Sequence, residues 1–235
     1  MTTLTSRWTM IAAAVLALPT LGVQAAHAES ISKWQQEFPI AECNMQTTGR
    51  NAHFILEPGY QLTLEADDKK LQMIVLDETK TVASVLTRVV EEREWEDGNL
   101  VEISRNYFAI CEGANDVYYF GEDVDYYKDG KVYKHEGAWL AGEGDNKPGL
   151  IMPGTPQPNM RYYQEIAPGV AMDRAEIVSL DEVCQTPAGT FSNCLKVKEG
   201  TALNILEAEY KFYAPGIGLI QDEDLVLTGH GMTSE

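Results

Sequence analysis

Two Asp-Gly dipeptides, Asp97-Gly98 and Asp129-Gly130, constrain the fold of this chain more than any other feature. Asp-Gly adopts the positive φ angles of a two-residue type I′ turn at little cost, so each dipeptide predicts two antiparallel strands joined by a tight hairpin. The predicted cross-strand pairs are Trp95 with Leu100, Arg93 with Glu102, Val89 with Asn106, Tyr127 with Val132, Tyr126 with Tyr133, and Asp125 with Lys134. Apolar, aromatic and opposite-charge pairs of these kinds stabilise a sheet, so turn chemistry and pairing agree.

The rest of the chain after residue 58 also carries strand signals. Alternating or β-branched runs bounded by turn residues predict short strands at regular spacing, and we find no long amphipathic helix and no internal repeat. The predicted strands are Tyr60–Glu65, Leu71–Leu76, Arg161–Ile166, Ala171–Leu180, a hairpin over Val183–Lys198, Glu207–Tyr213 and Gly218–Asp222, with a loop at Lys147–Asn159. We therefore expect a mainly β fold, an antiparallel β-sandwich or a partly closed β-barrel, preceded by a short N-terminal helix over Ser30–Phe38.

The amino terminus has the order of a secretory signal peptide. Arg7 precedes an apolar run over 8–23, and small residues stand at Ala26 and Ala28. The run is interrupted by Pro19 and is shorter than the roughly 20 residues that a membrane-spanning helix needs. We expect cleavage after Ala28, a periplasmic or secreted location, and no membrane span in the mature chain. The predicted organisation is a signal peptide at 1–28, an N-terminal segment at 29–58, one β-rich domain at 59–228 and a mobile tail at 229–235.

The charge balance narrows the classes of partner. The chain has 36 acidic and 18 basic side chains, a formal net charge of −18. A surface this negative repels nucleic-acid phosphates and anionic lipids, so we expect no nucleic-acid partner. Cations or uncharged molecules are the plausible ligands, and the expected partner is a small molecule or another exported protein.

Four cysteines, Cys43, Cys111, Cys184 and Cys194, would fold in an oxidising compartment after export. A hairpin centred on Gly189 places Cys184 opposite Cys194 and predicts a disulfide between them. Cys43 with Cys111 follows by elimination. No CxxC occurs, so a redox motif or zinc knuckle is poorly supported.

Six sequence runs resemble a family of exported bacterial proteins that has no assigned activity. The runs are Val89–Glu94, Tyr119–Asp125, His135–Trp139, Gly149–Pro153, Thr186–Phe191 and Tyr213–Gly218. The resemblance implies export and a single domain, and it brings no ligand or catalytic residue.

The segment from Tyr119 to Trp139 concentrates the residues that could carry chemistry. The segment does not match an EF-hand calcium loop when Gly130 is aligned with the glycine of that loop. Tyr127 stands where the loop requires a carboxylate, and the flanks are strand-like where the motif has helices. Extending the hairpin instead sets Asp123 opposite Glu136, two like charges that a sheet disfavours. Either the ladder has ended there, or a cation lies between them. Calcium held by Glu122, Asp123 and Glu136 is the metal site that this second alternative predicts.

The aromatic residues of the same segment predict one wall of a ligand-binding face. We assign that wall to Tyr119, Tyr126, Tyr133 and Trp139, because open grooves lined by aromatics commonly bind small molecules. No GxSxG, HExxH, P-loop or GxGxxG motif is present, so no catalytic residue is assigned.

Three functions remain open from the sequence. The leading interpretation is an exported soluble binding or accessory protein with no cofactor. One alternative is a hydrolase or lyase that uses Glu122, Asp123 and Glu136 with His135. The other is a structural protein that binds calcium through its acidic surface.

Overall fold

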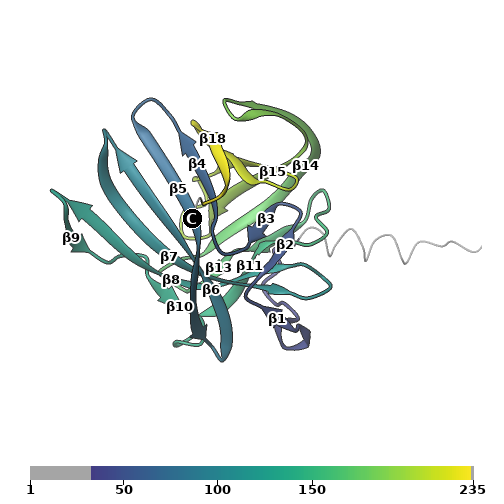
Figure 1. Cartoon of the computed structure of the whole chain (residues 1–235). Helices are drawn as coiled ribbons and strands as arrows, with labels where there is room; N and C mark the ends of the chain where they lie inside the picture. The colour runs from purple at the N-terminus through teal and green to yellow at the C-terminus, as the bar shows by residue number, and fades with distance from the viewer. Residues whose placement is uncertain (1–32, 234–235) are drawn as a thin grey trace, which may run out of the picture.

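The computed structural model describes residues 33–233, and nearly all of its strands belong to one antiparallel sheet (Figure 1). The predicted signal peptide lies outside the described residues. A 3-10 turn, η1, covers Ile40–Glu42. The strands are β1 (Met45–Gln46), β2 (Gly49–Asn51), β3 (Phe54–Leu56), β4 (Tyr60–Glu65), β5 (Lys69–Val82), β6 (Val85–Glu96), β7 (Asn99–Cys111), β8 (Val117–Lys128), β9 (Lys131–Lys134), β10 (Trp139–Leu140), β11 (Lys147–Met152), β12 (Arg161–Tyr163), β13 (Glu165–Ile166), β14 (Asp173–Thr186), β15 (Gly189–Thr201), β16 (Glu209–Ala214), β17 (Gly218–Asp222) and β18 (Leu225–Met232).

The large sheet curls until its two ends nearly meet. Its strand order is β12-β14-β15-β16-β17-β18-β4-β5-β6-β7-β8-β11-β13, and the end strands β12 and β13 follow one another in the chain. Between them the amide of Gln164 donates to the carbonyl of Asp173 at 2.7 Å. The result is a nearly closed, barrel-like antiparallel sheet, which confirms the predicted mainly β class.

A short hairpin of β2 and β3 covers one end of the barrel. The side-chain amide of Asn51 donates to the carbonyls of Asn115 (2.8 Å) and Pro153 (2.9 Å), and Gly216 N donates to Ala52 O at 2.7 Å. These contacts tie the hairpin to loops on opposite sides of the sheet order. Leu56 is completely buried, so the hairpin closes that end with apolar side chains.

Both Asp-Gly turns form, with positive φ at all four residues. In the first hairpin Trp95 faces Leu100 as predicted, but the register shifts by one residue between Glu94 and Trp95. Glu94 consequently faces Glu102, and Val90, not Val89, faces Asn106. The predicted Arg93–Glu102 pair is therefore wrong, because a one-residue slip exchanges the side chains that meet.

The second hairpin has a similar irregularity. Tyr127 faces Val132 as predicted, but Tyr126 faces Lys134 instead of Tyr133, and β9 ends at Lys134. The predicted opposition of Asp123 and Glu136 is wrong because the ladder stops before it reaches them. Asp123 faces Arg105 on β7.

The predicted N-terminal helix is not found over 33–38, the part of it that the structure describes. Gln35 instead pairs in parallel with Tyr162, and its amide donates to the carbonyl of Arg161 at 2.8 Å. Pro39 disfavours helical geometry at Phe38, and Trp34 packs beneath Arg174 (4.5 Å to the ring centroid). At the other end of the chain β18 extends to Met232, so residues 229–232 are paired strand and not the predicted tail.

The cysteines are arranged differently from the main prediction. Cys43 and Cys111 form a disulfide, with Cα atoms 5.2 Å apart, whereas Cys184 and Cys194 are buried free thiols. Thr186 faces Gly189 across a two-residue turn, so Cys184 faces Phe191, and irregularities in β14 set Cys194 opposite Glu182. The predicted direct opposition of Cys184 and Cys194 is therefore wrong. The two thiols are nevertheless close to each other, because burial and the neighbouring Cys194 thiol raise the pKa of Cys184 to about 12.

Within residues 33–233 no helix is long and apolar enough to cross a membrane.

Candidate functional site in the barrel interior

Acidic side chains converge inside the barrel. The charges of Lys211 on β16 and Asp222 on β17 shift the pKa of Glu92 on β6. Neither β16 nor β17 neighbours β6 in the sheet. Such coupling reaches across the interior, not along the sheet surface. We call the following residues the interior acidic cluster, of which Glu94 and Asp173 are solvent-exposed and lie at its margin: Glu92, Glu94, Glu102, Glu122, Glu165, Asp173, Glu199, Glu209 and Asp222.

One lysine lies within this cluster. The Nζ atom of Lys211 is 3.3 Å from a carboxylate oxygen of Glu199, 3.3 Å from Glu209 and 3.2 Å from Asp222. These three carboxylates outweigh the cost of burial and hold the pKa of Lys211 well above its ordinary value. Glu199 also accepts hydrogen bonds from the Gln164 amide (2.9 Å) and the Tyr213 hydroxyl (3.2 Å). Lys211 is thus a largely buried ammonium, with 21% of its side chain exposed, and three carboxylates surround it.

The other six members of the cluster have no cationic partner among the described residues. None of Glu92, Glu94, Glu102, Glu122, Glu165 and Asp173 lies within 4.0 Å of a lysine, arginine or histidine nitrogen there. Burial raises the pKa of Glu92 to about 8 and the pKa values of Glu102 and Glu122 to about 7. A large fraction of these groups is therefore protonated near neutral pH.

A cavity of about 130 Å³ lies between this cluster and the covering hairpin. Most of its wall is apolar: Phe54, Ile55, Leu62, Leu71, Met73, Val75, Val90, Phe108, Ile151, Met152, Ile217 and Leu219. Glu92, Glu199, Lys211 and Asp222 form its charged part. An apolar cavity of roughly 150 Å³ can hold a benzene molecule, so this one has room for a small ring with a polar substituent.

Two buried polar atoms lack hydrogen-bond partners in the described structure, one in the cavity wall and one beside Glu199. His53, which lines the cavity and is 8% exposed, has an unpaired Nδ1, and burial lowers its pKa so that it is neutral at pH 7. Tyr162, which is 1% exposed, has an unpaired hydroxyl close enough to Glu199 for that charge to raise its pKa. Buried polar groups are normally paired, so the His53 Nδ1 atom in the cavity wall is available to a ligand.

The predicted aromatic wall is only partly assembled. The rings of Tyr119 and Trp139 are buried and lie 5.4 Å apart, and Tyr119 stacks at 4.7 Å on Phe108, which lines the cavity. Tyr126 is beside Glu102 of the interior acidic cluster. Tyr133 is 62% exposed on β9 and does not join the others.

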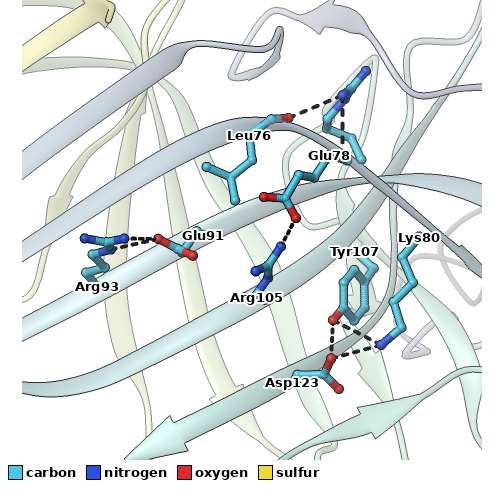
Figure 2. A network of polar contacts seen from close by, with 9 residues as sticks. Leu76, Glu78, Lys80, Glu91, Arg93, Arg105, Tyr107 and Asp123 are labelled. Carbon is cyan, nitrogen blue, oxygen red and sulfur yellow. Dashed lines mark hydrogen bonds and ion pairs between the residues drawn. The ribbon is translucent and has the colours of Figure 1, made fainter. Parts of the chain in front are cut away.

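The three predicted metal ligands are not brought together. Glu122 belongs to the interior acidic cluster, whereas Asp123 binds Lys80 (2.9 Å) and Tyr107 on the outer face of the sheet, as Figure 2 shows. Glu136 pairs with Lys134. His135, the predicted catalytic partner, contacts Asp125 (2.7 Å) instead. Within residues 33–233 no group of three or more histidine, cysteine, aspartate or glutamate side chains is arranged to hold a metal ion.

On the outer face of the same strands, acidic side chains form pairs with basic ones. Glu91 accepts from Arg93 at 2.7 Å, Glu78 pairs with Arg105, and Asp123 pairs with Lys80 (Figure 2). Acidic groups on the outside are thus matched by basic ones, and those on the inside of β6–β8 are not. The carboxyl groups without a basic partner on these strands therefore lie on the inner face of the barrel.

The sequence prediction missed most of the cavity. Glu92, Glu199, Lys211, Asp222 and His53 were not assigned, because their strands meet only when the sheet closes. The available signal was acidic side chains at alternate positions of predicted strands, such as Glu92 and Glu94, where a half-buried strand would have apolar residues.

Comparisons with known proteins add little to this geometry. No protein-family model and no curated protein matches the chain. A solved structure of a "putative lipoprotein" from Parabacteroides distasonis ATCC 8503 matches at 14% identity, covering 74% of this chain and 95% of that one, with a TM-score of 0.34. At that TM-score the similarity supports no inference about fold or function.

Proposed function

We propose that this protein is an exported binding protein that encloses a small, mostly apolar molecule inside its barrel, with the polar end of the ligand at the interior acidic cluster. The observation that carries the proposal is the cavity itself, which has an apolar wall, a charged part and an unpaired buried histidine. Cavities that are mostly apolar with a few convergent polar groups are the usual form of small-molecule sites.

Two independent features support export. Residues 1–28 have the basic, apolar and small-residue order of a cleaved signal peptide. Cys43 and Cys111 form a disulfide, a bond typical of proteins that fold in an oxidising compartment. A periplasmic or secreted location is the compartment consistent with both.

A carboxylate-dependent hydrolase or lyase remains the second candidate, now with different residues. Glu92 and Glu122 are coupled inside the barrel, with pKa values of about 8 and about 7. Carboxyl groups tuned to that range are suited to act as general acids near neutral pH. Turnover of a bound ligand, followed by mass spectrometry in wild type and Glu92→Gln, separates this candidate from simple binding.

The binding proposal is tested with toluene and benzyl alcohol as neutral probes. Ligand binding to the folded state alone raises the unfolding midpoint, so each probe should raise the Tm of wild type by a few degrees at saturation. Val75→Phe places a larger side chain in the cavity wall and should abolish the shift.

Leu86→Phe is the matched control, because Leu86 is 52% exposed and does not line the cavity. It should keep the full shift. A wild type that responds to neither probe, or equal shifts in wild type and Val75→Phe, would overturn the proposal.

A further inference from the structure

We infer that the ligand of this barrel carries a protonated amine, which binds beside Glu92 at the charged part of the cavity. The inference rests on the proposed binding function and names the chemical class of the ligand.

The charge inventory favours a cation. The interior acidic cluster has nine carboxyl groups, and Lys211 contacts only Glu199, Glu209 and Asp222. The remaining six have no basic partner among the described residues, and Glu92 is the one of them that lines the cavity. A ligand carboxylate or phosphate would meet only further carboxyl groups there, whereas an ammonium beside Glu92 would lower the pKa of Glu92 and pair with the carboxylate that forms.

Lys211 shows how this interior accommodates an ammonium group. It is a primary amine surrounded by three carboxylate oxygens at 3.2–3.3 Å, and it faces Asp222 directly across the β16–β17 ladder. Glu92 lines the same cavity from β6; Lys211 is near enough to lower the pKa of Glu92 but forms its ion pairs with the other three carboxylates. A ligand amine beside Glu92 would form the same kind of ammonium–carboxylate pair that Lys211 forms with its three partners.

The unpaired polar atom in the cavity wall fits an ammonium as well. An ammonium group has three donors and no acceptor. His53 is neutral, so its unpaired Nδ1 can accept a hydrogen bond in the tautomer protonated at Nε2.

An organic cation fits the site better than a metal ion. Among residues 33–233 no three histidine, cysteine, aspartate or glutamate side chains are arranged as metal ligands. The wall next to Glu92 consists of apolar residues such as Met73, Val90 and Phe108. These would bury a hydrocarbon body and contribute nothing to metal coordination.

The test uses four probes that share one ring: benzylamine, benzyl alcohol, toluene and benzoate. Binding is measured by calorimetry at pH 7.5. We expect benzylamine to bind at least tenfold more tightly than benzyl alcohol, and benzoate to show no binding. Glu92→Gln should weaken benzylamine about tenfold and leave benzyl alcohol unchanged.

Glu91→Gln is the matched control, because Glu91 is the adjacent residue on β6 and pairs with Arg93 on the outer face. It should keep wild-type affinity for every probe. If toluene and benzyl alcohol bind but benzylamine binds no more tightly, or if Glu92→Gln leaves benzylamine unaffected, the amine inference is overturned and the binding function stands. If none of the four binds, both fail.

Discussion

Glu94 on β6 and Glu102 on β7 face each other directly across an antiparallel ladder. Two carboxylates in that position repel, and a sheet normally avoids the arrangement. Burial followed by the charge of Glu94 raises the pKa of Glu102 to about 7, and burial raises the pKa of Glu94 as well. The pair is therefore tolerated because at least one of its members can hold a proton at neutral pH.

The raised pKa values predict a stability that falls as the pH rises. Glu92, Glu102 and Glu122 have folded-state pKa values of about 8, 7 and 7 against an ordinary value of 4.5, so between pH 4.5 and 8 the folded state binds more protons than the unfolded state. Stability is then greatest near pH 5 and declines towards pH 8. Calorimetry should show a Tm lower by about 5 °C or more at pH 8 than at pH 5.5.

Outer carboxylates do not reverse this trend. The hydroxyl of Tyr107 and the ammonium of Lys80 lower the pKa of Asp123 despite its partial burial, so its contribution is lost only on acidification below its ordinary value of 3.8. Glu92→Gln removes one of the raised groups and should flatten the decline. A Tm that rises between pH 5.5 and 8 would contradict the burial of the interior acidic cluster.

Removing the buried ammonium should destabilise the protein strongly. Lys211→Met leaves Glu199, Glu209 and Asp222 without their cation. Breaking a buried pair in this way costs about 3–5 kcal/mol, because the charges left behind are uncompensated. Chemical denaturation at pH 8 should detect the loss, and the loss should shrink at pH 5.5, because burial raises the pKa values of Glu209 and Asp222 and favours their protonation.

Lys80→Met is the control for that measurement. Lys80 pairs with Asp123 on the outer face, where its side chain is 34% exposed, and partly exposed pairs of this kind contribute about 0–1 kcal/mol. If both lysine variants lose the same stability, Lys211 is not the central cation of the interior.

The local part of the fold could be predicted from the sequence. Asp97-Gly98 and Asp129-Gly130 form the expected turns because their chemistry is contained in four residues. The register one or two residues beyond each turn could not be predicted, since a single irregularity at Glu94 or Tyr126 shifts the pairing. The sequence of a single strand does not predict such an irregularity.

The cavity could not be predicted for a related reason. Glu92 and Lys211 are 119 positions apart in the sequence, on strands that neighbour one another neither in the chain nor in the sheet. They line one cavity only because the whole barrel closes. The sequence prediction instead gave weight to acidic residues that are close in sequence, Glu122, Asp123 and Glu136, and neighbouring residues on a strand point to opposite faces.

Peptide mapping without reduction should recover a Cys43–Cys111 link and free thiols at Cys184 and Cys194. Both free thiols are buried, so an alkylating reagent should modify them only after unfolding. The disulfide closes a segment with a sequence separation of 68, and the double variant Cys43→Ser, Cys111→Ser should lose about 4 kcal/mol in the chain-entropy account. A Cys184–Cys194 link in the mature protein would show that the observed thiol state is not the native one.

Calcium should leave the stability of this protein unchanged. Each of the three predicted ligands has other contacts: Glu122 lies with the interior acidic cluster, Asp123 pairs with Lys80, and Glu136 pairs with Lys134. A calcium ion needs six to eight oxygen ligands that converge at 2.3–2.6 Å, and these carboxylates point to different sides of the sheet. Thermal unfolding in millimolar calcium should therefore match unfolding in chelator within about 1 °C, because an ion that does not bind the folded state cannot raise its midpoint.

The double variant Asp123→Asn, Glu136→Gln is the control, and calcium should not change its midpoint either. If calcium raises the midpoint of wild type but not of this variant, Asp123 and Glu136 do share a cation, and the hairpin of β8 and β9 must rearrange to allow it.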